Sequence, residues 1–200
     1  MNQHEQEGVI KYTSNAIQRP ISGSIDFNEF FRVRHELFSL GFIGEDEHGL
    51  GYGNLSIRLY SSPRFLITAS QTSGLEWISS HELAEVLSVD LYRNCLTYAG
   101  FAKASSESMT HAALYQADPG IRAIVHIHSR KLWQAALDVY PTTKKDVAYG
   151  TPEMAFEVIR LHRVIRTQSG IMVLGGHQDG IISFGPTISD AFHLIRSMSS

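Results

Sequence analysis

The chain has 200 residues, of which 43% are hydrophobic and 18% are charged, a composition typical of a globular protein with a substantial core. Its formal net charge of -3 excludes the basic surface that nucleic acid requires, and no apolar run approaches the roughly 18 residues of a membrane span. Residues 1–8 contain no apolar signal core, and the single Cys95 has no partner for an intrachain disulfide. We therefore expect a cytoplasmic protein with no nucleic-acid or membrane partner.

The chain divides into a short N-terminal segment and one domain. Residues 1–23 show no clear periodicity and are expected to form a loosely ordered lead-in, followed by a single domain over residues 24–200. Asp26 and Glu29 resemble a capping box, and apolar residues at helical spacing predict a first helix that ends at Gly41.

Hairpins and helices then follow each other along the chain. Two short runs, 55–60 and 65–70, flank a Ser-Ser-Pro turn and predict a hairpin. The other predicted elements are a short helix at 79–82, a strand at 86–92, helices at 105–117 and 151–170, a strand at 123–129, a hairpin of 171–174 with 180–184, and a helix from 187. This succession predicts an α/β sandwich with a mixed or antiparallel sheet flanked by helices.

Two histidines alternate with apolar residues in the predicted strand at 123–129. Period two places His126 and His128 on one face, where two imidazoles can chelate one cation if a third ligand comes from elsewhere. A bare His-x-His is equally consistent with two half-buried or surface histidines.

His177 is the candidate third ligand. Glycines on both sides let the backbone bend sharply and bring the ring close to another element. The alternative is a surface turn residue, which is the commoner role for an isolated histidine in a glycine-rich turn. Three neutral imidazoles leave an open coordination position, the pattern of a catalytic rather than a structural metal site.

Glu107 is the acid/base candidate, at the start of a predicted helix. Ser105 and Ser106 precede it and can cap the helix or, with free backbone N–H groups, bind an anion such as phosphate. Simple capping by all three residues is the alternative. His111 shares a helix face with Glu107 and is interpreted as a core or supporting histidine rather than a ligand.

Five segments together resemble the class II aldolase/adducin family over roughly residues 27–195. They are Gly53-Asn54-Leu-Ser56, Leu66-Ile-Thr68 with Thr72-Ser73-Gly74, Ser105-Ser106-Glu107, His126-x-His128 and Gly-His177. Each small-residue segment alone is also explained by turn chemistry, but their order and spacing agree with the family.

The resemblance implies a three-layer α/β/α sandwich with a central mixed, largely antiparallel sheet, assembled as a homotetramer with active sites near subunit interfaces. It further implies that His126, His128 and His177 bind one divalent metal, zinc by preference, with manganese, iron or cobalt as alternatives. Glu107 would be the catalytic acid/base. A phosphorylated ketose would be cleaved through a metal-stabilised enediolate. The substrate phosphate would be bound by Gly53, Asn54, Ser73, Gly74, Ser105 and Ser106.

Three departures from the family pattern bear on the substrate, one of them a C-terminal segment after Ile195 that is short beside the long tail of some members. Ala69-Ser70-Gln71 is an insertion in the predicted phosphate loop, and the region after His128 is short, leaving Tyr140 and Tyr149 as candidates for a site tyrosine. Alternatives to the aldolase are a methylthioribulose-phosphate-type dehydratase, a pentulose-phosphate epimerase and an adducin-like interaction module without catalysis.

Overall fold

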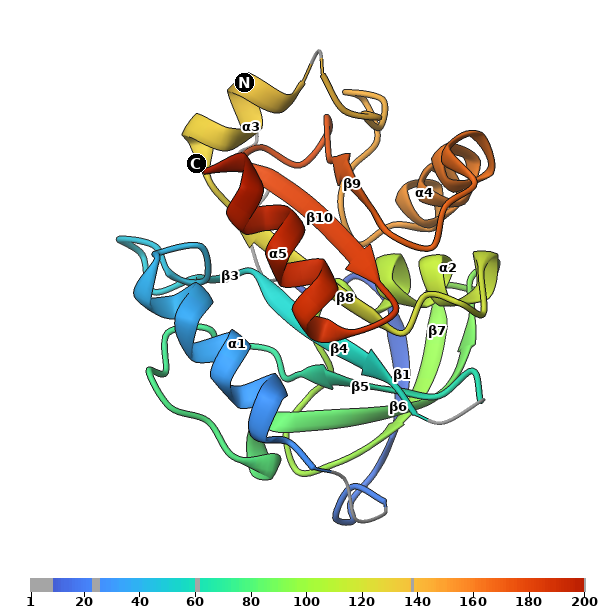
Figure 1. Cartoon of the computed structure of the whole chain (residues 1–200). Helices are drawn as coiled ribbons and strands as arrows, with labels where there is room; N and C mark the ends of the chain where they lie inside the picture. Colours follow the sequence, from blue (N-terminus) through green and yellow to red (C-terminus); the bar gives the residue numbers. More distant parts are fainter. Residues whose placement is uncertain (1–8, 23–25, 60–61, 138, 200) are drawn as a thin grey trace.

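The computed structural model of the chain describes residues 9–22, 26–59, 62–137 and 139–199. Its main sheet consists of β1 (Thr13–Ile17), β4 (Asn54–Arg58), β5 (Phe65–Thr68), β6 (Leu83–Asp90), β7 (Cys95–Ala99), β8 (Ala123–His128), β9 (Gly170–Val173) and β10 (Gly180–Gly185). The strand order is β1-β7-β6-β5-β4-β8-β10-β9 (Figure 1). The β1–β7 pair is parallel and the other neighbouring pairs of these strands are antiparallel. A separate small hairpin pairs β2 (Gly44–Glu45) with β3 (Gly51–Tyr52).

Helices cover both faces of the main sheet, which confirms the three-layer sandwich. One face packs against α1 (Asn28–Ser39) and α5 (Ile188–Met198), and the other against α2 (Ser108–Ala117) and α4 (Pro152–Ile165) (Figure 1). Two short helices, η1 (Ser80–Glu82) and α3 (Arg130–Ala136), complete the elements of the described residues. None of these helices is both long and apolar enough to cross a lipid bilayer.

The alternation along β8 decides which layer receives the histidines. Val125 and Ile127 belong to the core beneath α1 and α5, whereas Ile124 belongs to the core beneath α2 and α4. His126 and His128 alternate in phase with Ile124, so both lie on the face covered by α2 and α4. The predicted strand thus positions both imidazoles toward the helix that begins near Glu107.

Local sequence signals set most helix starts, with two corrections. Thr151 caps α4 as predicted, accepting a hydrogen bond from the N–H of Met154 at 3.3 Å, but the helix ends at Ile165 because Arg166 adopts a left-handed conformation with φ 50°. The capping box predicted for Asp26 and Glu29 does not form. Asp26 accepts from the N–H of Asn28, and Glu29 instead accepts a hydrogen bond from the Ser189 hydroxyl of α5.

The N-terminal segment contains a strand that the sequence pattern did not indicate. Residues 1–8 and 23 of the expected lead-in lie outside the described residues, but β1 pairs with β7 along its whole length. All five side chains of β1 are exposed, so it lacks the apolar alternation by which a strand is recognised. β7 was also missed. The predicted strand at 86–92 ends at Asp90, and a turn with Asn94 at φ 48° returns the chain into β7.

Candidate metal centre

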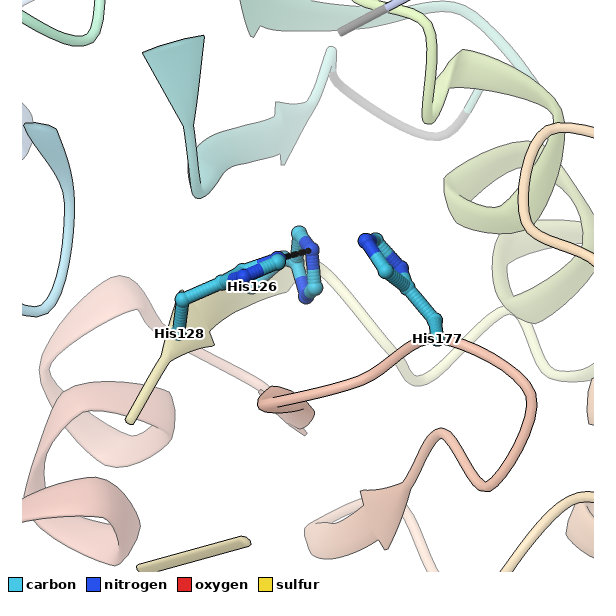
Figure 2. Close-up of side chains that lie close together, drawn as sticks. All are labelled: His126, His128 and His177. Carbon is cyan, nitrogen blue, oxygen red and sulfur yellow. Dashed lines mark hydrogen bonds between the residues drawn. The ribbon is translucent and has the colours of Figure 1, made fainter. Parts of the chain in front are cut away.

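Three imidazoles converge above the β8–β10 part of the sheet. His126 and His128 project from β8, and His177 reaches toward them from the turn between β9 and β10 (Figure 2). One nitrogen from each ring can be chosen so that all three lie within 4.8 Å of one another. The Nε2 atoms of His126 and His128 are 3.2 Å apart. The structure therefore brings together all three predicted ligands.

Close packing of the β9–β10 turn accounts for the position of His177. The N–H of Leu174 donates to Gly180 O at 3.0 Å, and the N–H of His177 donates to Leu174 O at 3.2 Å, closing a tight turn. Gly176 packs directly against the preceding segment, where an added Cβ would overlap the carbonyl oxygen of Val147. Any side chain at Gly176 would displace the turn and with it the His177 ring.

Hydrogen bonding and burial give His126 the form that a divalent cation requires. His126 Nδ1 lies 3.1 Å from the carbonyl oxygen of Ile181 and donates to it, because a carbonyl only accepts. The His126 Nε2 lone pair is then left for a cation. Burial lowers the pKa of His126 well below its usual value, and the neighbouring His128 and His177 lower it further, so the ring is neutral.

The spacing of the nitrogens fits one cation. Two imidazole ligands on a tetrahedral cation with bonds of about 2.0–2.1 Å stand roughly 3.3 Å apart. The 3.2 Å between the Nε2 atoms of His126 and His128 matches that separation. Chemistry and spacing of the donor set both suit a divalent metal ion.

Glu107 lies beside the histidines. It is buried immediately before the first residue of α2, and its Oε1 atom is 3.9 Å from Nδ1 of His177. Among the described residues its carboxylate caps no N–H of the helix, whereas the Ser105 hydroxyl accepts from the N–H of Glu107 at 3.2 Å. This Ser105 bond closes the turn that precedes α2 and does not cap the helix, and the Glu107 carboxylate lies beside His177.

His111 is a core residue, as predicted. Its Nδ1 atom is 2.7 Å from the Ser56 hydroxyl, which also lies 2.7 Å from the Tyr115 hydroxyl. The ring is completely buried, and burial lowers the pKa of His111 to about 3. Among the described residues, the histidines close enough together to hold a metal ion do not include His111.

One half of the predicted phosphate pocket adjoins the metal centre. Asn54 is the register partner of His126 on the neighbouring strand, and it is buried. The Ser73 hydroxyl donates to Gly53 O at 2.9 Å, which joins the two predicted loops. The Glu45 side chain fills the space beside Gly74, where its carboxyl carbon overlaps the position that a Cβ would take. The structure thus brings a carboxylate to the Ser73-Gly74 end of the predicted pocket.

The other half of the predicted phosphate pocket, Ser105 and Ser106, follows a segment that contacts the inserted loop. Ala69 forms a bridge with Ala104, and the N–H of Ser70 donates to Lys103 O at 2.8 Å. The insertion therefore contacts the segment that leads into Ser105 and Ser106, which are both buried.

Two tyrosines lie beside the histidines, of which the sequence indicated Tyr149 as a candidate and did not indicate Tyr52. Tyr149 stacks on His177 with ring centroids 4.6 Å apart and an interplanar angle of 24°, and Tyr52 lies tilted over His128 at 5.5 Å. Of the two tyrosines considered after His128, Tyr149 reaches the site and Tyr140 packs against the core on the α1 side. The Tyr-Gly-Thr-Pro run before α4 places Tyr149 near a helix start, but nothing local indicates its partner.

A cavity of about 470 Å³ adjoins the metal centre at His128. It is lined by Gly41, Asp46, Tyr52, His128, Ser129, Arg130, Gln178 and Asp179. Of the three candidate ligands, His128 is the one that lines this cavity.

The profile of the family described as Class II Aldolase and Adducin N-terminal domain matches residues 44–199. The chain belongs to this family. Human gamma-adducin is 32% identical over 99 residues, a stretch that covers 42% of this chain and 14% of the adducin, and rat gamma-adducin is 31% identical over a stretch of the same length. The chain thus corresponds to a small part of these longer relatives.

Solved structures with this fold include enzymes. L-fuculose-1-phosphate aldolase from Thermus thermophilus aligns with a TM-score of 0.63 and 22% identity, covering 86% of this chain and 88% of that one. Sugar-phosphate aldolase from Thermotoga maritima aligns with a TM-score of 0.64 and 16% identity, covering 85% and 88%. These likenesses confirm the predicted fold.

Proposed function

We propose that this protein is a metal-dependent class II aldolase-like lyase that cleaves a small phosphorylated ketose. The observation that carries the proposal is the convergence of three imidazole nitrogens within 4.8 Å, with the Glu107 carboxylate 3.9 Å from one of the rings. His126, His128 and His177 would hold one divalent cation, with zinc as the first candidate and manganese, iron or cobalt as the others.

A bound cation would supply Lewis-acid stabilisation of the negative charge that develops on substrate oxygens. Retro-aldol cleavage removes the proton of the hydroxyl group on the carbon β to the carbonyl and breaks the adjacent carbon–carbon bond, which releases an aldehyde. A proton is then delivered to the carbon of the ketone fragment that was left with the bonding electrons. Glu107 is buried beside the ligands, so its carboxylate is held within reach of a substrate seated on the histidines. Glu107 would therefore be the acid/base, and no Schiff-base lysine is needed.

The substrate phosphate would lie among Gly53, Asn54, Ser73, Gly74, Ser105 and Ser106. These residues offer hydroxyl, amide and backbone donors. Because Ser73 already donates to Gly53 O and Glu45 lies against Gly74, we expect Asn54, Ser105 and Ser106 to carry most of the phosphate contact. The remaining carbons would extend into the cavity that adjoins His128.

The test is an activity screen with Glu107→Gln as the matched variant, because it removes the ionisable group and keeps the side-chain volume. Protein loaded with zinc, manganese, cobalt or ferrous iron would be given phosphorylated ketoses, and aldehyde release would be measured. We expect cleavage by the wild type and a loss of about 10²- to 10⁴-fold in Glu107→Gln with metal content unchanged. Water elimination or epimerisation in place of aldehyde release would assign the site to a different reaction.

We further propose that the protein is a cytoplasmic homotetramer with the site near a subunit interface. Light scattering on purified protein tests the assembly, and a monomer with full activity would contradict it. An adducin-like module without catalysis would show no turnover with any metal or ketose phosphate.

A further inference from the structure

Lys11, in the segment that leads into β1, reaches a residue far along the chain. Its ammonium donates to Tyr149 O at 3.1 Å and lies 4.1 Å from the centroid of the Tyr149 ring. A cation at this distance from an aromatic ring is attracted to the ring, and the attraction strengthens where water is excluded. Tyr149 is only 2% exposed and Lys11 is partly buried, so the ring side of the contact is shielded from water.

Tyr149 in turn holds the third candidate ligand. Its ring lies nearly parallel to that of His177, with an interplanar angle of 24° and ring centroids 4.6 Å apart. His177 is the ligand that comes from a turn, whereas His126 and His128 are fixed by the ladders of β8. The stacked tyrosine ring restricts rotation of the His177 imidazole about its side-chain bonds. A ligand in a turn needs this restraint more than a ligand in a strand, whose backbone is already fixed by its neighbours.

The position of Lys11 is fixed by contacts on both sides. The Asn94 side-chain amide donates to Lys11 O at 2.9 Å, and the N–H of Thr13 donates to Asn94 O at 2.9 Å. The buried Tyr12 hydroxyl donates to Ala104 O at 2.6 Å, just before the Ser105-Ser106-Glu107 run. The segment is thus tied to the β6–β7 turn and to the approach to α2.

We infer that Lys11 is a positioning residue of the metal centre, which holds Tyr149 against His177 and so keeps the third imidazole in its ligating orientation. The inference rests on the proposed metal site but is independent of the reaction and the substrate. Groups that orient a ligand without touching the metal commonly change metal affinity by 10- to 100-fold when they are removed.

The test compares zinc dissociation constants measured by chelator competition. Lys11→Met keeps the apolar stem and removes the charge, and we expect zinc binding to weaken roughly 5-fold, the equivalent of about 1 kcal/mol of cation–ring attraction. Tyr149→Leu removes the stack and should weaken zinc binding by about 10- to 100-fold. Lys11→Arg retains the charge and should keep the wild-type zinc affinity. Lys131 is an exposed lysine of α3, and Lys131→Met serves as the control for the loss of a surface charge.

A second readout separates orientation from general loss of stability. At saturating cobalt(II), the visible ligand-field spectrum of Lys11→Met and Tyr149→Leu should differ from that of the wild type, while Lys11→Arg and Lys131→Met should not differ. Unchanged zinc affinity and an unchanged spectrum in Lys11→Met would overturn the inference, whatever Tyr149→Leu shows, and would leave the metal site intact. A wild-type protein that binds no zinc would overturn the metal site itself.

Discussion

Replacing Gly53 with alanine should damage both the fold and the metal centre, and Gly49 provides a matched control. Both glycines have φ of +73°, but nothing lies within 4 Å of a Cβ at Gly49, whereas a Cβ at Gly53 would stand 2.5 Å from Ile43 Cγ2 and 3.1 Å from His126 O. An alanine at either position would therefore have the same backbone strain, and only at position 53 would its Cβ also overlap neighbouring atoms.

The magnitudes follow from these contacts. A left-handed conformation costs an L-residue about 1–2 kcal/mol, partly offset by the lower entropy of the unfolded alanine chain, so Gly49→Ala should destabilise by about 1 kcal/mol. Overpacking against the buried Ile43 adds about 1–3 kcal/mol, so Gly53→Ala should destabilise by about 2–4 kcal/mol. The new Cβ would also press on the backbone carbonyl of His126, a candidate metal ligand, so Gly53→Ala should weaken zinc binding by about 10-fold or more.

Urea unfolding gives the stability of each variant, and chelator competition gives its zinc affinity. Gly49→Ala should keep wild-type zinc affinity. Equal stability of the two variants, with equal zinc binding, would refute the argument that the Gly53 turn is held against β8 by close contact.

Further predictions concern the phosphate pocket and the core. Ser106→Ala removes one charge-assisted hydrogen bond, so the rate with phosphorylated substrates should fall by about 10- to 150-fold while the metal content stays unchanged. Equal rates with phosphorylated and unphosphorylated sugars would show a different substrate class. Burial holds the pKa of His111 at about 3, against 6.5 in the unfolded chain. Between these values only the unfolded chain takes up the proton, so the free energy of unfolding decreases as the pH is lowered below 6.5. At pH 5 the loss is about 2 kcal/mol, and in urea unfolding His111→Leu should lack this part of the pH dependence; an identical pH slope in both proteins would contradict it.

The sequence predicted the elements whose patterns are local. The period-two run at 123–129 indicated both the strand and the shared face of His126 and His128, and the glycines around His177 indicated a turn that approaches another element. The cap at Thr151 formed as expected, whereas α2 begins at Ser108 instead of residue 105 and has no side-chain cap. In each confirmed case one stretch of chain contained the whole physical reason.

The features that were missed depend on partners distant in sequence. β1 is an edge strand with exposed side chains, and its pairing with β7 is visible only once the sheet has formed. The stack of Tyr149 on His177 and the contact of Glu45 with Gly74 likewise join segments that share no local pattern. Tertiary packing decides such contacts, so single-sequence periodicity carries no information about them.

The metal content of the purified protein tests the central claim most directly. Wild-type protein would be stripped with chelator, reloaded with zinc, dialysed and analysed by elemental mass spectrometry beside His177→Ala. The account predicts one zinc per wild-type chain and a loss of most of it in the variant, because two imidazoles alone leave the site incomplete. Wild-type protein that holds no zinc, or His177→Ala that retains it fully, would contradict the assignment of His126, His128 and His177 as one metal centre.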